Sequence, residues 1–519
     1  MNDRGALDVT DNLHRAMDFS RDSGTRLETN HRDTLPRSGM LWWAFCGRSK
    51  LTTIRAATVP NDGIIRYLGI FNIERLLPLS PQALAEILVT KSDDFVKPQT
   101  MRNGIGRILG FGLLFAEGDV HKAQRKKLMP AFASRHIKEL YPVFWEKSRE
   151  SALAMTNKVH MDAGKPKASE IGQIAANQAI IELCGWASRT TLDIIGVAGM
   201  GKDFGAIADP DTPLFRTYRA LFQQSQGSSV LTAISQLLPG VIVRNLPIKL
   251  NSEVEKAVRI IRQTCHDLIR SKKEKLEKKD LTDVDILSVA LESGLFTDDN
   301  LVDQLMTFLV AGHETTASSL TWAVYSLCLH PSVQTRLRTE VHANLPSLSS
   351  DKPVTSLDID NMPYLNAVCN EVLRYFPPVA ITVRDAAVDT SILGCPVPAG
   401  TKIFLAPRAT NRDKTLWGEE ADKFNPDRWL AGSPASPHVT NGGASSNYAM
   451  MTFLQGPRTC IGQAFSKAEF ACLLAAWVGR FEFELANEKD RDEKNLAAAG
   501  LTARPANGLW VKVRVVDAW

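Results

Sequence analysis

The order of hydrophobic and polar positions along the chain favours helices over most of its length. Apolar residues recur at the three-to-four-residue spacing of a helix face in a series of long segments. These segments are Asp119–Leu128, Ser134–Val159, Lys167–Gly199, Glu253–Glu277, Asn300–Leu329 and Val333–Asn344.

Strand-like runs are fewer and shorter than the helical ones. Between Ile64 and Val89, β-like runs alternate with helical ones, whereas the glycine-rich stretch between Ser92 and Gly118 predicts irregular structure. Further strands are expected at Val383–Ala386, Lys402–Leu405 and Val511–Val515. The pattern therefore predicts a mixed, mostly α fold with a minor β-rich lobe.

The segment from Asn300 to Leu329 is apolar on several sides, which is typical of a core helix. Its middle reads Ala-Gly-His-Glu-Thr-Thr over residues 311–316. A glycine there costs about 1 kcal/mol relative to alanine, and paired threonines propagate a helix poorly. An acid and two hydroxyls are also costly to bury unless they have partners. Such a conflict inside a strong helix indicates a functional site, although a packing glycine beside threonines that bond back to their own helix would explain it too.

Composition and charge narrow the class of protein. The 519 residues are 44% hydrophobic and 23% charged, and the net charge of +4 is too small for a nucleic-acid-binding footprint. No linker or internal repeat divides the chain, so we expect one large domain over 51–519, after a polar extension over 1–50. The first apolar run, Met40–Phe45, is far shorter than the roughly 20 residues of a membrane span, so the extension shows no clear anchor.

The eight cysteines are scattered, without a CxxC pair or the short spacing of a zinc finger. This argues against a disulfide scaffold or a zinc site and favours a reducing compartment. Most of them should be small buried hydrophobes. One differs by its neighbours: Cys460 lies in the run Phe-Leu-Gln-Gly-Pro-Arg-Thr-Cys-Ile-Gly over residues 453–462, directly before an amphipathic helical segment.

This run resembles the haem-binding signature of the cytochrome P450 family, and the resemblance extends over most of the chain from about residue 60 onward. It implies haem b (iron protoporphyrin IX) with Cys460 as the axial thiolate and metal ligand. The dipole and the free amides at the start of the following helix would favour the ionised thiolate. Gly456 and Gly462 would allow a tight turn and close approach to the macrocycle. Arg458 would pair with a haem propionate, and Phe453 would shield the sulfur from water.

The same resemblance assigns a structural triad. Glu371 and Arg374 match the family's Glu-x-x-Arg element, whose spacing places both charges on one helix face. Arg428 lies in Phe-Asn-Pro-Asp-Arg-Trp, residues 424–429, which resembles the family's Pro-Glu-Arg-Phe segment with Asp427 in place of Glu and Trp429 in place of Phe. A buried triad of Glu371, Arg374 and Arg428 would hold the Cys460 loop.

Three further basic residues match positions that contact the propionates in the family. His121 and Arg125 lie in the segment 118–125, where His121 replaces the usual tryptophan, and Arg384 follows the pair Pro377–Pro378. Each alone would be interpreted as a surface residue. Together they supply the charge needed to bury a doubly anionic cofactor.

Residues 311–316 match the family's oxygen-binding helix. In that interpretation Gly312 leaves room for dioxygen, and Glu314 and Thr315 form the catalytic acid–alcohol pair that delivers protons. The resemblance implies a monooxygenase that inserts one oxygen atom from O2 into a hydrophobic small molecule, as many fungal members do with secondary (terpenoid-, polyketide- or alkaloid-like) metabolites. A haem-thiolate isomerase, dehydratase or peroxide-using enzyme, or a non-catalytic haem sensor, stays open as an alternative.

The expected partners also follow from the resemblance. Electrons would come from NADPH through a separate cytochrome P450 reductase to a monomeric chain, and cytochrome b5 could be a further partner. The expected location is the cytosolic face of the endoplasmic reticulum membrane, with the cytoplasm as the alternative. Substrate contacts are expected from five mostly apolar segments: Gly104–Phe115, Leu214–Val243, Phe308–Gly312, Val379–Val383 and Gly500–Thr502.

Overall fold

The structure is a computed structural model. It describes residues 61–69, 73–164, 175–222, 249–278, 284–294, 296–433, 436–496, 502–505 and 507–516, together with Val59 and Trp519. The predicted polar extension over 1–50 lies outside the described residues. So do parts of two segments expected to contact the substrate, namely 223–243 and 500–501.

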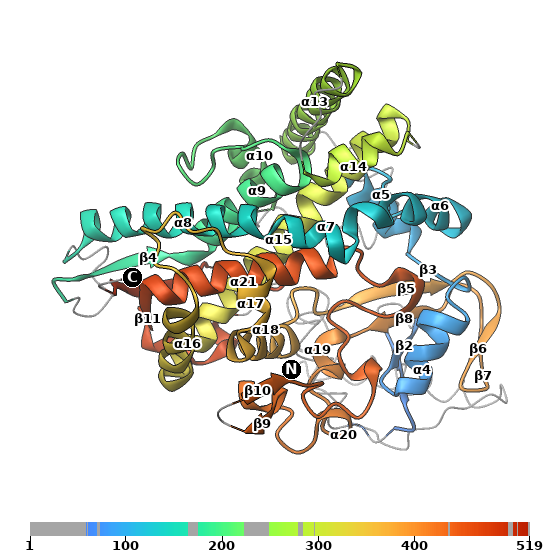
Figure 1. Cartoon of the computed structure of the whole chain (residues 1–519). Helices are drawn as coiled ribbons and strands as arrows, with labels where there is room; N and C mark the ends of the chain where they lie inside the picture. Colours follow the sequence, from blue (N-terminus) through green and yellow to red (C-terminus); the bar gives the residue numbers. More distant parts are fainter. Residues whose placement is uncertain are drawn as a thin grey trace, which may run out of the picture.

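The central element is helix α15, Asp298–Leu329. It begins where Thr297 accepts a hydrogen bond from the Asn300 amide. The negative charges of two aspartates in its first turn stabilise it by interacting with the positive end of the helix dipole. Most of its side chains are buried, as the hydrophobic pattern predicted for a core helix. It packs against α9 (Leu183–Met200), α13 (Lys249–Glu277) and α21 (Gln463–Arg480), and Figure 1 shows it crossing the middle of the molecule.

Long helices build a layered core around α15. Helix α8 (Tyr141–Asp162) lies along α21, as Figure 1 also shows, while α16 (Pro331–Asn344) and α18 (Pro363–Tyr375) cover the other side of α21. The remaining α-helices are α4 (Pro81–Ala85), α5 (Gln99–Leu109), α6 (Gly118–Leu128), α7 (Ser134–Glu139), α10 (Pro213–Phe222), α14 (Ile286–Glu292), α17 (Ser356–Asp360), α19 (Pro407–Thr410), α20 (Lys414–Trp417) and α22 (Glu493–Leu496). Short 3-10 or π turns are η3 (Glu86–Thr90), η4 (Met129–Phe132), η5 (Pro426–Trp429), η6 (Asn447–Ala449), η7 (Gly456–Arg458) and η8 (Glu488–Arg491).

The strands form small sheets at the margins of this core. The largest has the order β1-β2-β8-β5-β3, and it lies with α4 on the side of Figure 1 away from β11. Its strands are β1 (Ile64–Leu68), β2 (Glu74–Pro78), β8 (Lys402–Leu405), β5 (Thr382–Ala386) and β3 (Phe95–Val96). A second sheet has the order β11-β12-β4, from β11 (Phe481–Leu485), β12 (Trp510–Val515) and β4 (Gln178–Glu182). The hairpins are β6 (Thr390–Ile392) with β7 (Cys395–Val397), and β9 (Leu430–Ser433) with β10 (Ser436–Val439).

Two helix predictions were wrong in detail. The segment Ser134–Val159 is two helices, α7 and α8, because Pro142 in the first turn of α8 has no amide hydrogen to continue an earlier helix. The described part of Lys167–Gly199 begins with strand β4, which pairs with β12. Its apolar run suits either structure, and pairing with the sheet decides it. Glu182 then caps α9 by accepting from the amides of Cys184 and Gly185.

The stretch between Ser92 and Gly118 is not irregular throughout, because it contains helix α5. Gly104 and Gly106 lie inside that helix, and contact with α15 stabilises it despite their poor propensity. Gly110, with φ +73°, ends it. Strands β5, β8 and β12 lie where the pattern predicted strands. Among the described helices, none combines the length and the apolar character that a bilayer crossing requires.

Candidate active site

The Cys460 loop connects η7 with the start of α21. The Cys460 amide donates to the carbonyl oxygen of Phe453 at 2.9 Å, and the Thr459 amide donates to that of Gly456 at 3.0 Å, so the loop is closed by its own backbone. Leu454 has a positive φ of 56°, which is costly for a side chain of this size and marks a constrained turn. The Cys460 side chain is exposed at the end of this turn.

The two glycines of the loop meet different surroundings. A Cβ on Gly456, whose φ is +72°, would lie 2.2 Å from the carbonyl oxygen of Leu88 in η3, so packing inside the protein already requires glycine. A Cβ on Gly462 would meet its nearest neighbours at ordinary contact distances, with the Cys460 sulfur 4.0 Å away. Glycine at 462 therefore keeps the space beside the sulfur clear rather than relieving a clash with the chain.

The Cys460 thiol lies in a mixed electrostatic environment. Although the residue is exposed, the protein atoms packed around the thiol remove much of its hydration, which raises the pKa. The Gly462 amide and the charge of Arg125 act in the opposite direction and favour the thiolate. Arg125, from α6, also donates to the Thr459 carbonyl oxygen at 2.8 Å and so joins that helix to the loop.

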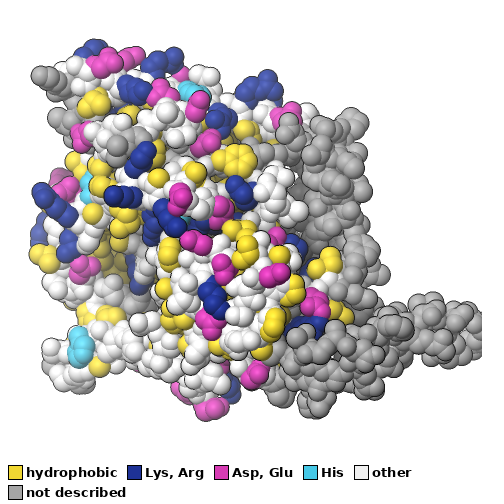
Figure 2. All heavy atoms as spheres, turned by 90° about the vertical axis from the view of Figure 1, so that its right-hand side faces the viewer, with side chains coloured by type: hydrophobic (Ala, Val, Ile, Leu, Met, Phe, Trp, Pro, Cys, Tyr) yellow, Lys and Arg dark blue, Asp and Glu magenta, His cyan; other side chains and the backbone are white. Residues whose placement is uncertain are grey.

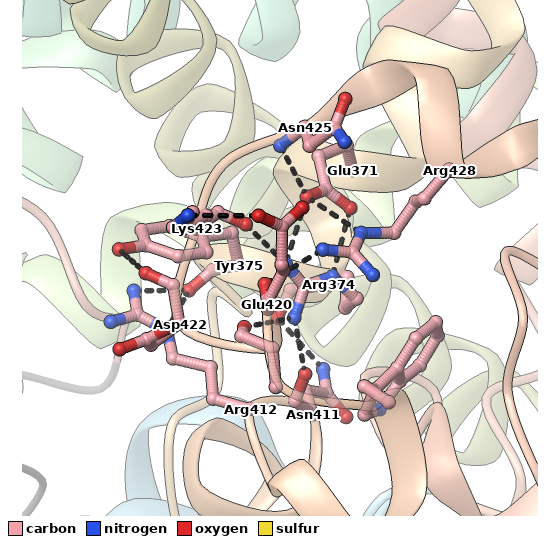
Figure 3. A network of polar contacts seen from close by, with 12 residues as sticks. Glu371, Arg374, Tyr375, Asn411, Arg412, Glu420, Asp422, Lys423, Asn425 and Arg428 are labelled. Carbon is pink, nitrogen blue, oxygen red and sulfur yellow. Dashed lines mark hydrogen bonds and ion pairs between the residues drawn. The ribbon is translucent and has the colours of Figure 1, made fainter.

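Glu371, Arg374 and Arg428 meet in a buried ion-paired cluster (Figure 3). The Glu371 and Arg374 side chains are fully buried and bond through two parallel contacts of 2.8 Å, a bidentate geometry. Arg428 reaches Glu371 Oε1 at 3.2 Å. Trp429, which replaces the family's phenylalanine, donates from its indole nitrogen to Glu371 Oε2 at 2.9 Å, so this departure adds a hydrogen bond.

Asn411 links this triad to the chain that precedes the Cys460 loop, and sequence reasoning missed it. The Arg374 guanidinium donates to the Asn411 carbonyl oxygen at 2.7 Å. The Asn411 side chain accepts from the Met451 amide at 2.7 Å and donates to the Thr452 hydroxyl at 2.8 Å. Asn411 is completely buried, but a single asparagine beside arginines in the sequence gives no signal of that burial.

Arg384 and Arg458 are cations in a poorly hydrated environment. Arg384, on β5, is 3% exposed, and among the described residues it donates only to uncharged oxygens, those of Val383 at 2.9 Å and Thr382 at 3.3 Å. Arg458 pairs with Glu117 and donates to the Ala116 carbonyl oxygen at 2.6 Å. Burial lowers the pKa of each guanidinium to about 10.

Lys97 and His121 belong to the same basic cluster, and sequence reasoning missed Lys97. Lys97 is buried at the end of β3, and burial together with Arg384, Arg458 and Arg102 holds the pKa of its ammonium well below its usual range. Burial, with Lys97 and Arg125 nearby, lowers the pKa of His121 to about 4, so its imidazole is neutral at neutral pH. No feature of the sequence around Lys97 distinguishes it from a surface lysine.

The charges of this cluster suit a doubly anionic ligand. Over the described part of the chain, no carboxylate forms an ion pair with Lys97 or Arg384. Buried cations without counter-ions are costly, and they are found where a bound anion compensates them. Arg125 connects the cluster to the Cys460 loop. A haem, with its two propionates and an iron that takes a thiolate, fits both groups of residues.

Gly312 in the middle of α15 faces α9. A Cβ at this position would lie 2.9 Å from Ile195 Cδ1, so a side chain here would force the Ile195 side chain to shift. Thr315, half-buried, donates from its hydroxyl to the Ala311 carbonyl oxygen at 2.7 Å, and Ala311 itself is exposed. The alternative explanation of this segment was a glycine that packs against a neighbouring helix beside threonines that bond back to their own helix, and the structure contains both features.

Glu314 points to the C-terminal part of the chain. Its buried carboxylate lies 3.1 Å from the Arg504 guanidinium and 3.3 Å from His313 Nε2. Burial alone would raise the pKa of Glu314, but His313, Arg504 and the Thr502 hydroxyl outweigh it and lower the pKa. Glu314 is therefore ionised and held beside the turn at 502–504, within one residue of Thr315 along the helix.

Of the segments expected to contact a substrate, the one over 104–115 packs against α15, which itself carries the one over 308–312. The loop after α5 is fixed to α15, since Asp303 accepts from the Phe111 amide at 3.0 Å and Gln304 from the Leu113 amide at 2.9 Å. The rings of Phe308 and Phe132 are 5.5 Å apart, edge to face. The 379–383 segment is only partly buried.

We expect the Lys97→Met variant to change stability in opposite directions with and without haem. In the haem-free protein, removing a buried unpaired cation should raise the free energy of unfolding by about 1–3 kcal/mol. In the haem-bound protein, haem should be lost faster. Denaturant unfolding of the haem-free protein and the rate of haem transfer to an excess of haem-free globin measure the two effects. Lys122→Met is the control, because that ammonium is exposed and pairs with Asp93. A less stable haem-free Lys97→Met protein would contradict the expectation.

Comparison with known proteins agrees with this geometry. The family model described as cytochrome P450 matches residues 72–510. The chain is 47% identical to cytochrome P450 monooxygenase sphH of Aspergillus fumigatus, over 89% of this chain and 83% of that protein. It is 43% identical to cytochrome P450 monooxygenase ALT8 of Alternaria alternata, over 94% and 90% of the two chains. It is 45% identical to cytochrome P450 monooxygenase FUM15 of Gibberella moniliformis, over 87% and 81%.

Proposed function

The chain belongs to the cytochrome P450 family, and from that premise we propose that it is a haem b monooxygenase with Cys460 as the thiolate ligand, acting on a hydrophobic secondary metabolite. The observation that carries the proposal is the position of Arg125, which bonds to the Cys460 loop and belongs to the buried basic cluster. One flat, doubly anionic group with a thiolate-binding iron satisfies both sets of residues.

When bound, the haem iron supplies the activation of dioxygen, with electron donation from the thiolate. The chain supplies the binding and the electrostatics. Arg458, Arg384, Lys97 and Arg125 compensate the propionates, and neutral His121 offers a hydrogen-bond donor without a further charge. Gly462 keeps the space beside the sulfur clear, and Phe453 packs against the apolar core next to it.

Glu314 and Thr315 have separate parts in proton delivery. Thr315 presents a hydroxyl from the half-buried face of α15, next to exposed Ala311, and is the proton donor, with water, on the substrate side. Glu314, which is ionised at rest, takes up a proton on the side of Arg504 and His313 and passes it to Thr315, so it relays the protons that Thr315 delivers. The apolar surroundings exclude bulk water, so that the oxidising equivalent meets the substrate.

We also propose the finer points of organisation. Residues 51–519 form one domain after a polar extension over 1–50, and the triad of Glu371, Arg374 and Arg428 holds the Cys460 loop through Asn411. Electrons come from NADPH through a separate reductase to a monomer, with cytochrome b5 as a further partner. The protein acts at the cytosolic face of the endoplasmic reticulum membrane.

Exposed apolar side chains support a location at a membrane surface. Leu68, at the end of β1, and Phe111, after α5, are each 51% exposed, and Val120 on α6 is 61% exposed. Helices α5 and α6 lie on the same side of Figure 1, the side that faces the viewer in Figure 2, where hydrophobic side chains lie among charged ones. Partition onto such a surface needs apolar contact and a modest basic charge.

Thr315→Ala tests the proposed function. With reductase and NADPH, the product formed per NADPH should fall about tenfold and hydrogen peroxide should rise, since a positioned proton donor contributes roughly 10²–10⁴-fold and water replaces part of it. Thr321→Ala is the matched control, because Thr321 makes the same back-bond to its own helix, at 2.8 Å, inside the core. The substrate is first found by binding spectra against a panel of apolar metabolites. Unchanged coupling in Thr315→Ala would exclude the proton-delivery role, and NADPH-independent conversion or no conversion would favour an isomerase or a sensor.

A further inference from the structure

Glu469 is a buried acid that the proposed chemistry leaves without a role. It lies on α21, the helix that follows the Cys460 loop, and its side chain is completely buried. Among the residues that the structure describes, neither carboxyl oxygen has a hydrogen-bond partner of good geometry. An ionised carboxylate in such a place would be very costly, and a buried acid avoids the cost by keeping its proton. Burial raises the pKa of Glu469 well above its usual range.

The polar neighbour of this carboxyl is on the opposite helix. The hydroxyl of Thr316, on α15, is close enough to the Glu469 carboxyl to lower its pKa somewhat. Among the described residues, no lysine, arginine or histidine is close enough to affect this pKa. The thiol of Cys472, also on α21, is near this carboxyl, and burial raises its pKa as well. The carboxyl therefore faces one hydroxyl in an otherwise uncharged environment.

The hydrogen of the Thr316 hydroxyl is already used. It donates to the Gly312 carbonyl oxygen at 3.2 Å, one turn back along α15. A hydroxyl has one hydrogen to donate, so Thr316 meets Glu469 through its oxygen lone pairs. Only a protonated carboxyl donates to that oxygen. The use of the Thr316 hydrogen and the burial of the carboxyl therefore both indicate that Glu469 is protonated and neutral.

We propose that Glu469, as a neutral acid, donates to the Thr316 hydroxyl and through it fixes the Gly312 carbonyl, which positions the turn of α15 that carries Glu314 and Thr315. This chain of contacts runs from α21 to α15, so the helix behind the Cys460 loop sets the geometry of the proton-delivering turn. Glu469 is a positioning residue, because it acts through Thr316. The inference rests on the proposed function for the roles of Glu314 and Thr315.

Infrared spectroscopy of the purified holoprotein tests the protonation state directly. At neutral pH we expect a carbonyl stretch from a protonated buried carboxylic acid that is absent from Glu469→Gln. The absence of such a difference band would overturn the proposal, because an ionised Glu469 cannot donate. This measurement needs neither a substrate nor turnover, so its result stands whether or not the chain is a monooxygenase.

Variants test the positioning role. With reductase and NADPH and without substrate, Glu469→Leu and Thr316→Val should each release about fivefold more hydrogen peroxide per NADPH, as the loss of one buried hydrogen bond predicts. Their amides over 308–316 should exchange hydrogen faster. Glu469→Gln and Thr316→Ser keep a donor and an acceptor and should behave like the original chain. All are compared at equal amounts of thiolate-ligated haem.

The outcomes separate the two proposals. If Glu469→Leu and Thr316→Val both release peroxide and exchange their amides as the original chain does, the positioning role is wrong. If Glu469→Gln is as impaired as Glu469→Leu, the role requires a charge and the neutral-donor proposal is overturned. If the original chain lacks the red-shifted Soret band, the proposed function fails, while the infrared band and the amide exchange still decide the hydrogen-bond chain.

Discussion

Replacing Cys460 by serine is expected to abolish the red-shifted Soret band of the reduced, CO-bound protein and all oxygenation activity. Serine is nearly isosteric but is not ionised at neutral pH, so it provides no thiolate to the iron. Haem should still bind to a considerable extent, because Arg384, Arg458 and Lys97 are unchanged. The measurements are the CO-difference spectrum, the haem content per chain and product formation.

Cys395→Ser provides the control for this variant. Cys395 lies on the hairpin strand β7, outside the Cys460 loop, and its replacement should leave the spectrum unchanged. Persistence of the red-shifted band in Cys460→Ser would mean that another thiol binds the iron. The ligand assignment would then be wrong.

Replacing Glu371 by glutamine is expected to cause the largest loss of stability. The Arg374 guanidinium would remain fully buried with its counter-charge removed, and breaking such a pair costs about 3–5 kcal/mol. The damage should reach the haem site, since Arg374 holds Asn411 and Asn411 holds the Met451 amide before the Cys460 loop. Denaturant unfolding and the fraction of purified protein with thiolate-ligated haem give the two readouts.

Glu420→Gln is a control from the same region (Figure 3). Glu420 is exposed and pairs with Lys423 at 2.8 Å, and an exposed pair contributes little. We expect no measurable change in stability or haem content. If Glu371→Gln behaved like Glu420→Gln, the triad would have no structural role.

The long helices could be predicted from the sequence because burial on several sides leaves a strong periodic pattern. Helix α15 begins and ends within two residues of the predicted Asn300–Leu329. Helix α5 and strand β4 could not be predicted from local sequence. Contact with α15 stabilises α5 against its low helix propensity, and pairing with β12 selects the strand at β4, whose apolar run has no clear preference. The order β1-β2-β8-β5-β3 depends on pairings between distant segments, about which hydrophobic periodicity says nothing.

The candidate site divides in the same way. Cys460, Arg458, Glu371 and Arg374 lie in short runs with a recognisable spacing, and the sequence therefore identifies them. Lys97, Glu117 and Asn411 come from separate segments and acquire their importance only through burial and the partners that folding brings. Glu314 was assigned from its motif, but its contact with Arg504, 190 residues later, needed the structure.

The uncompensated cations of Lys97 and Arg384 also affect how much of the protein a cell can keep. A ligand that binds only the folded chain stabilises it by RT ln(1 + [L]/Kd), and the folded population determines exposure to proteases. Without haem the chain retains the full cost of those buried charges. Newly made chains should therefore survive quality control in proportion to the haem supply, so that cofactor biosynthesis, rather than transcription alone, limits abundance in a producing host.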